Sequence, residues 1–147
     1  RTADCYPVIL MDNRINVIAA LHCGREGTRK NIVGEAIRIM NSQMYCQLTD
    51  IIAIVGAGIC HNHYEVSQEL YNEFGKSIVS QGLEPVLTKN RHIDLRKTLN
   101  AQLLKAGIPE INIEHINDCT FENSCYHSYR REKTNNRQIN IVGIIHG

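Results

Sequence analysis

Short apolar runs separated by polar turns recur along the chain and predict a set of β-strands. Several of these runs are apolar at consecutive positions, which is typical of strands that are covered on both faces. The predicted strands are residues 8–11, 15–21, 51–55, 111–115 and 139–145. The polar triplet Asp12, Asn13 and Arg14 predicts a tight turn between the first two strands, which would then form an antiparallel hairpin.

Three longer segments place apolar residues at helical spacing. The first predicted helix covers residues 28–43, and the second covers residues 64–74, with Gly75 as its C-cap. The third begins after Asp94, a suitable N-cap, and buries one leucine-rich face before Gly107 ends it. Its predicted core positions are Leu95, Leu99, Leu103 and Ala106.

The strands and helices intermix without a strict βαβ repeat. This order favours an α+β fold, a mixed sheet or sandwich core flanked by helices, over a doubly wound sheet. The 147 residues suit one domain, residues 1–147, and the 43% hydrophobic content is that of an ordinary globular protein. No repeat or linker interrupts it.

The charge and the cysteine content indicate which kinds of partner and which cellular compartment to expect. A net charge of +1 suggests neither a nucleic acid nor a membrane surface as partner. No apolar run reaches the roughly 20 residues that span a bilayer. The six cysteines contain no C-x-x-C pair, which favours reduced thiols in a soluble cytoplasmic protein. The sequence leaves the oligomeric state open.

Cys5 and His22 are the first candidates for chemistry. Cys5 precedes the first predicted strand and His22 follows the second, so a hairpin would bring both to the same end of the sheet. A thiolate and an imidazole can ligate zinc, or the imidazole can deprotonate the thiol for nucleophilic attack. The spacing alone favours a buried structural cysteine beside an ordinary strand-end histidine, because free cysteines are commonly buried.

Motifs along nearly the whole chain resemble the laccase-domain (YfiH/YlmD) family. Thr2-Ala3-Asp4-Cys5-x-Pro7 is followed by a strand, and His22-x-Gly24-x-x-Gly27-Thr28 follows the next strand. Further similar segments appear in the family's order. They are Gly56-Ala57-Gly58-Ile59, Tyr64-Glu65-Val66, Asp94-Leu95, Asn100, Gln102-Leu103, Gly107-Ile108, Cys119-Thr120, Ser128-Tyr129-Arg130-Arg131, Thr134 and Arg137-Gln138.

The resemblance implies a zinc site and activity on purine nucleosides. It assigns Cys5 and His22 as zinc ligands, with a third ligand, a histidine, from a segment upstream of Arg1. The chain is therefore expected to be an N-terminally truncated domain, similar in fold to a bacterial toxin deamidase. The implied reactions are phosphorolysis of adenosine, inosine or methylthioadenosine and deamination of adenosine. Purine nucleoside and phosphate would be the substrates. The resemblance favours Arg130 as a catalytic residue, which could bind phosphate or a substrate carboxylate.

The chain departs from the family pattern at two places. Arg25 and Glu26 stand where the family has tryptophan and a basic residue, and a carboxylate there would repel phosphate. His61 and His63 follow the glycine loop and could supply a replacement zinc ligand, or be solvated loop residues. Cys119 could line the pocket or be structural. His146-Gly147 superficially matches a family His-Gly pair but lies at the wrong end of the chain.

Three other functions remain open. Cys5 and His22 could form a metal-free Cys-His hydrolase or amidase, as in members linked to editing of peptidoglycan precursors. The chain could also be a catalytically impaired fragment or paralogue, because two ligands alone hold zinc weakly. Polyphenol oxidation ranks last, since a multi-copper cluster needs more histidines together than the seven scattered ones supply.

Overall fold

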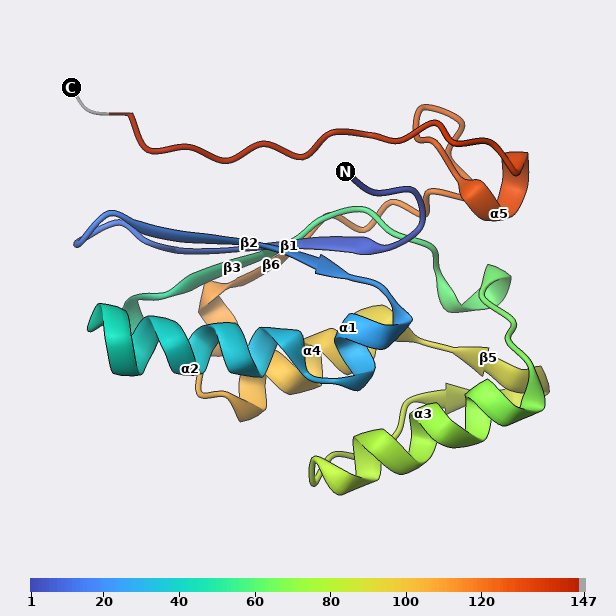
Figure 1. The fold of residues 1–147 in the computed structure, drawn as a ribbon, viewed down its shortest axis with the longest axis horizontal. Helices are drawn as coiled ribbons and strands as arrows, with labels where there is room; N and C mark the ends of the chain where they lie inside the picture. The colour runs from blue at the N-terminus through green and yellow to red at the C-terminus, as the bar shows by residue number, and fades with distance from the viewer. Residues whose placement is uncertain (146–147) are drawn as a thin grey trace.

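The computed structural model describes residues 1–145 and is built on a four-stranded mixed sheet (Figure 1). Strands β1 (Tyr6–Asp12) and β2 (Val17–Cys23) form an antiparallel hairpin. Strand β3 (Ile52–Val55) pairs antiparallel with β1, and β6 (Ile113–His115) pairs parallel with β3. The strand order is β2-β1-β3-β6.

The remaining elements are five α-helices, a short two-stranded sheet and four single-turn 3-10 helices, counted over residues 1–145. The α-helices are α1 (Arg25–Arg29), α2 (Ile32–Met44), α3 (Gln68–Ser80), α4 (Leu95–Lys105) and α5 (Tyr129–Glu132). The small sheet joins β4 (Leu87–Thr88) to β5 (His92–Ile93). The 3-10 helices are η1 (Leu48–Asp50), η2 (His61–His63), η3 (Lys89–Arg91) and η4 (Glu110–Asn112).

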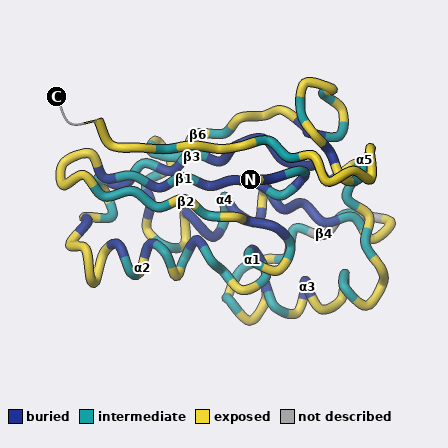
Figure 2. The backbone as a smooth tube through the Cα atoms, turned by 45° about the horizontal axis from the view of Figure 1, so that its top comes forward, coloured by how far each residue is buried: buried dark blue, intermediate teal, exposed yellow. Residues whose placement is uncertain are grey.

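The molecule has two layers and a partial third. Helices α1, α2 and α4 lie on one face of the sheet, and the C-terminal segment runs across the opposite face (Figures 1 and 2). The core lies between sheet and helices, where Leu10, Val55, Ile37 and Leu99 are at most 2% exposed. Among the described residues, no helix combines the length and apolar character that crossing a bilayer requires.

The predicted fold class is confirmed, since one domain combines a mixed sheet with helices. The predicted hairpin and the strands near residues 51–55 and 111–115 are present. Helix α4 also follows the prediction: the Asp94 side chain accepts a hydrogen bond from the Lys97 amide at 3.0 Å. Its residues Leu95, Leu99 and Leu103 are buried as expected.

The first predicted helix, residues 28–43, is wrong in its bounds because it is two helices. Helix α1 ends at Arg29 and α2 begins at Ile32. Asn31 between them has a φ of 56°, and its side-chain oxygen accepts a hydrogen bond from the Gly34 amide. The spacing of apolar residues gave no sign of this break, because the left-handed conformation of Asn31 interrupts the helical backbone without changing that spacing.

The second predicted helix, residues 64–74, begins and ends later than expected. The Val66 amide donates to the Arg91 carbonyl, so the segment before α3 pairs with another loop and cannot enter the helix. Ser67 is the N-cap, and its hydroxyl accepts from the Leu70 amide. Gly75 is not the C-cap. It is buried inside α3, which continues to Ser80.

The predicted strand at residues 139–145 is wrong. The segment is extended but belongs to neither described sheet, and Ile139, Ile141 and Ile145 are 66%, 85% and 95% exposed. Its apolar residues favour a strand, but a strand needs a partner edge, and this segment lies above the sheet face instead (Figure 1). His146-Gly147 lies outside the described residues.

Candidate functional site

Four segments meet at one end of the main sheet. Strand β1 begins where β2 and β3 end, because both run antiparallel to it, and β6 ends there because it is parallel to β3. The register pairs Tyr6 with Cys23 and Val55 with His115 at this end. The residues that precede β1 and those that follow β2, β3 and β6 are therefore neighbours in space.

Cys5 and His22 converge on Gly24, as the hairpin predicted. Gly24 has no side chain, and a Cβ placed on it would lie 2.7 Å from Cys5 Sγ and 3.9 Å from His22 Cδ2. His22 is exposed, Cys5 is half-buried, and Gly24 is buried. The thiol and the imidazole thus border one small space that only glycine leaves open.

Asp4 positions the Cys5 segment against the C-terminal third of the chain. This buried residue has a φ of 82°, in the left-handed region. Its carboxylate accepts hydrogen bonds from the Thr120 hydroxyl at 2.8 Å and the Arg130 amide at 2.7 Å. Its carbonyl accepts from the Ile59 amide at 2.9 Å. This role was not predicted from the sequence, although Asp4 lies inside the motif that identified Cys5.

The environment of Cys5 favours the neutral thiol. Burial raises the pKa of Cys5 above its ordinary value, and the negative charge of Asp4 raises this pKa further. The positive charge of Arg137 acts in the opposite direction. Deprotonation at neutral pH therefore needs an additional cation or base, and a metal ion is such a cation for a coordinating thiol.

Two arginines lie around Tyr64 near this site. Burial raises the pKa of Tyr64, while the charges of Arg25 and Arg130 lower it and that of Cys5 raises it. The Arg130 guanidinium lies 5.3 Å from the centre of the Tyr64 ring, and its Nη1 donates to the Glu65 carbonyl at 2.9 Å. The Arg130 side chain is therefore held by Tyr64 and Glu65, while its amide binds Asp4, the residue before Cys5.

Glu26 forms ion pairs with both Arg25 and Arg29. Its carboxylate is 2.8 Å from Arg29 Nη2 and 3.3 Å from Arg25 Nε. The hydrogen bond from Arg29 and then the neighbouring charges lower the pKa of Glu26, so its negative charge persists at neutral pH. The sequence predicts that this carboxylate opposes phosphate binding. Because Glu26 also forms an ion pair with Arg25, it would compete with phosphate for the Arg25 guanidinium.

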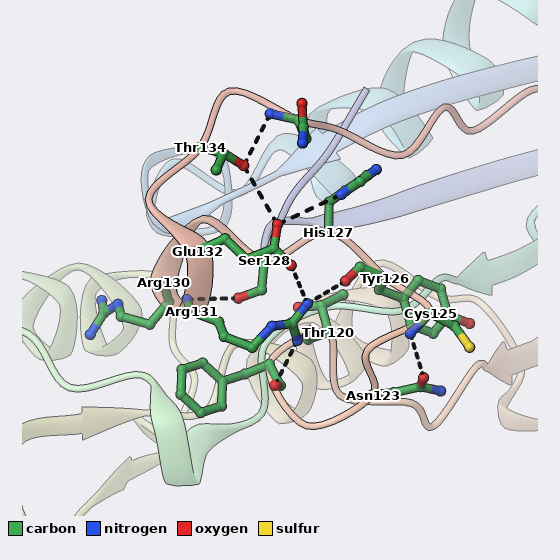
Figure 3. Close-up of polar contacts among 12 residues, drawn as sticks. Thr120, Asn123, Cys125, Tyr126, His127, Ser128, Arg130, Arg131, Glu132 and Thr134 are labelled. Atoms are coloured by element: carbon green, nitrogen blue, oxygen red, sulfur yellow. Dashed lines mark hydrogen bonds and ion pairs between the residues drawn. The ribbon is translucent and has the colours of Figure 1, made fainter.

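Arg131 organises the loop that precedes α5 (Figure 3). Its Nη1 donates to the carbonyls of Thr120 and Phe121 at 2.7 and 2.8 Å, and its Nη2 donates to the Tyr126 carbonyl at 2.6 Å. Its Nη2 also lies 2.5 Å from Glu132. These bonds give Arg131 a role in loop structure, which separates it from its neighbour Arg130.

His61 and His63 pair with carboxylates. The Nδ1 of His61 lies 3.5 Å from Asp94, and the Nε2 of His63 lies 2.9 Å from Glu122. Both interactions draw the rings toward loops other than the one that carries Cys5. These contacts give no support to either histidine as the third ligand beside Cys5.

A shallow groove lies beside His22, between the helix-free face of the sheet and the C-terminal segment. Its volume is about 110 Å³, and Pro7, Ala20, Asn140 and Val142 are among its lining residues. Pockets for small-molecule ligands usually enclose roughly 300–1,000 Å³. The groove therefore forms part of a nucleoside pocket at most.

The site offers a soft donor and a nitrogen donor to a metal ion. Cys5 Sγ and His22 are donors that zinc takes readily, and both border the space beside Gly24. A catalytic zinc site has three protein ligands, so these two residues fit the ion as part of a complete set.

The chain matches one protein family and is similar in sequence to enzymes named for two activities. The family model for "Multi-copper polyphenol oxidoreductase laccase" matches residues 1–145. The chain is 32% identical to a purine nucleoside phosphorylase of Bacteroides thetaiotaomicron, over 82% of this chain and 46% of that protein. It is 33% identical to a purine nucleoside phosphorylase of Corynebacterium glutamicum, over 95% and 55%. It is 32% identical to an adenosine deaminase from an unknown prokaryotic organism, over 88% and 51%.

Solved structures share the fold. YlmD of Geobacillus stearothermophilus has a TM-score of 0.81 at 22% identity, over 90% of this chain and 50% of that chain. A YfiH protein of Bacillus licheniformis has a TM-score of 0.77 at 26% identity, over 90% and 51%. The chain spans about half the length of the curated relatives and the solved structures that it matches.

Proposed function

Because the chain belongs to the multi-copper polyphenol oxidoreductase laccase family, we propose that it carries part of a zinc-dependent purine nucleoside phosphorylase centre. The proposed substrates are adenosine, inosine and methylthioadenosine with phosphate, and adenosine deamination is the second proposed activity. Two of the relatives are named purine nucleoside phosphorylase, and the third is named adenosine deaminase. The observation that carries the proposal is the convergence of Cys5 and His22 on Gly24.

In the proposed centre, Cys5 and His22 are zinc ligands. A zinc ion bound there would supply Lewis-acid polarisation and hydroxide near neutral pH, which deamination of a purine requires. The Asp4 carboxylate binds the Thr120 hydroxyl and the Arg130 amide, and so sets the position of the Cys5 loop. Because Gly24 has no Cβ, the Cys5 sulfur can lie directly against it.

Phosphorolysis needs phosphate beside the sugar, and Arg130 and Arg25 are the proposed phosphate ligands. In this reaction a phosphate oxygen bonds to the anomeric carbon of the ribose while the bond to the purine nitrogen breaks. Guanidinium groups suit phosphate because they donate two parallel hydrogen bonds. Arg130 is positioned by Tyr64 and the Glu65 carbonyl, whereas Arg25 is shared with Glu26. Deamination should therefore depend less on these residues than phosphorolysis does.

Incubation of zinc-loaded protein with adenosine tests the proposal. We expect adenine only when phosphate is present, and inosine with or without phosphate. Cys5→Ser and His22→Asn should abolish both products, while Cys125→Ser, at an exposed cysteine, should leave both unchanged. Absence of adenine and inosine from zinc-loaded protein would contradict the proposal for this chain.

The metal-free Cys-His hydrolase is the second candidate, since the same proximity of Cys5 and His22 favours it. The raised pKa of Cys5 counts against a resident thiolate nucleophile. Alkylation of the metal-free protein at pH 7 distinguishes the two candidates. A zinc-site cysteine should react slowly there, whereas rapid and selective alkylation of Cys5 would favour the hydrolase.

A further inference from the structure

A second group of metal-binding side chains lies between the loop after β3 and the loop after β6. The ligand atoms of Cys60, Cys119 and Glu122 all lie within 4.8 Å of one another. Cys60 Sγ lies 3.5 Å from Glu122 Oε1, and the Cys60 amide donates to Cys119 Sγ at 3.2 Å. None of these three residues belongs to the Cys5 and His22 centre.

The backbone holds the two loops side by side at this point. Gly58 and Cys119 form a parallel β-bridge, and the Thr120 amide donates to the Gly58 carbonyl at 3.1 Å. Arg131 binds the carbonyls of Thr120 and Phe121 and so restrains the same loop (Figure 3). Main-chain pairing therefore holds the segments that carry Cys60 and Cys119 side by side.

His63 sets the position of the carboxylate. Its Nε2 lies 2.9 Å from Glu122 Oε1, and its ring stacks on Phe121 with centroids 4.2 Å apart. Carboxylates that bind a metal ion are themselves hydrogen-bonded by neighbouring groups, which restrain their orientation, and His63 makes a contact of this kind with Glu122. Cys119 is 6% exposed, Cys60 is intermediate and Glu122 is exposed, so the group has a buried side and an open side.

We propose that Cys60, Cys119 and Glu122 bind a zinc ion at a second site, with His63 orienting Glu122. Two sulfurs and one carboxylate oxygen form a donor set that zinc accepts and that magnesium or calcium does not favour. Zinc bond lengths place ligand atoms roughly 3.3–3.8 Å apart. Side-chain rotations that move these ligand atoms by about 1 Å would bring all three within bonding distance of one ion. The exposed side leaves a fourth position for water or another ligand.

Charge balance supports this site. Two thiols and a carboxylate gathered in one place carry unfavourable mutual repulsion when they ionise. A divalent cation removes that repulsion and binds the deprotonated sulfurs.

Cobalt(II) binding to the reduced protein tests the site, because each thiolate bound to cobalt adds to the sulfur-to-cobalt charge-transfer absorbance. The titration uses Cys5→Ser protein, so failure of the proposed Cys5 and His22 centre cannot be mistaken for failure of this one. We expect one cobalt per chain with two-thiolate intensity, displaced by zinc. Cys60→Ser and Cys119→Ser in this background should lower the intensity by half or abolish it, and Cys125→Ser should leave it unchanged.

Substitutions at Glu122 and His63, which are exposed or partly exposed, test the site without disturbing the folded core. Glu122→Gln and His63→Ala should each weaken cobalt binding about 10-fold while the two-thiolate band remains at saturation. Far-UV circular dichroism checks that each variant is folded. The proposal is overturned by a Cys5→Ser protein without the charge-transfer band. A band of undiminished intensity in the Cys60→Ser protein, or a Cys60–Cys119 disulfide that persists in reductant and excludes cobalt, would also overturn it.

Discussion

At the scale of single residues, the candidate centre depends on the absence of a side chain at Gly24 as much as on its ligands Cys5 and His22. Gly24 has a φ of −82°, which any residue can adopt, so backbone conformation does not explain the glycine. The steric reason is that a Cβ at this position would lie only 2.7 Å from Cys5 Sγ. The sequence motif showed that glycine stands here, and the structure supplies the reason.

Gly24→Ala should therefore impair metal binding without unfolding the protein. The added methyl group would displace Cys5 Sγ and narrow the space beside His22. We expect zinc affinity at this centre to fall by about 10-fold or more. Competition with a chromophoric chelator measures it in a Cys60→Ser background. Gly143→Ala is the matched control, since nothing lies within 4 Å of its Cβ position. Equal affinities for the two variants would contradict the steric argument.

Glu26 offers a residue-scale test of the phosphate site. Glu26→Gln removes a negative charge and releases Arg25 from its 3.3 Å ion pair. We expect the KM for phosphate in phosphorolysis to fall about threefold, because an anion meets a more positive site. The rate of deamination, which uses no phosphate, should stay the same. Glu35→Gln, at another exposed ion-paired glutamate, is the control, and an equal effect there would refute a local role.

At the scale of elements, local sequence predicted most of what positions the centre. The hairpin was predictable because its two apolar runs and polar turn are adjacent in sequence, and it brings Cys5 to His22. The carboxylate bonds of Asp4 to Thr120 and Arg130 were not predictable, because they join residues more than 110 positions apart. Patterns of period two or 3.6 describe faces of elements and carry no information on such contacts.

Asn31 explains why one predicted helix is two, and its substitution tests that explanation. Asn31→Ala loses the cap to the Gly34 amide, which costs about 1 kcal/mol, and strains a left-handed backbone by a further ~1 kcal/mol. We expect urea unfolding to show a free energy of unfolding lower by about 2 kcal/mol. Asn31→Gly relieves the strain and should cost less than half as much. Equal losses would show that the left-handed conformation carries no strain.

At the scale of the whole molecule, the two faces of the sheet differ. Three helices cover one face, while the other meets the C-terminal segment and the groove beside His22 (Figures 1 and 2). The apolar runs predicted strands covered on both sides, and they did not specify what covers the second side.

Two truncations test how much the fold depends on that segment. The backbones of Thr2 and Gln138 exchange hydrogen bonds at 3.1 and 3.0 Å, whereas Ile141 and Ile145 are 85% and 95% exposed. Deletion of residues 141–147 should therefore change the free energy of unfolding by less than about 1 kcal/mol. Deletion of residues 134–147 also removes the Gln138 pair and should cost roughly 1–3 kcal/mol more.

The longer deletion should also weaken zinc binding, because Thr2 belongs to the segment that presents Cys5 and loses its only β-bridge within residues 1–145. Urea titration followed by circular dichroism measures stability, and chelator competition on the same two proteins measures zinc affinity. If the shorter deletion alone cost more than 2 kcal/mol, the exposed isoleucines would be part of the folded core in solution. The second face of the sheet would then depend on the C-terminal segment itself for its cover.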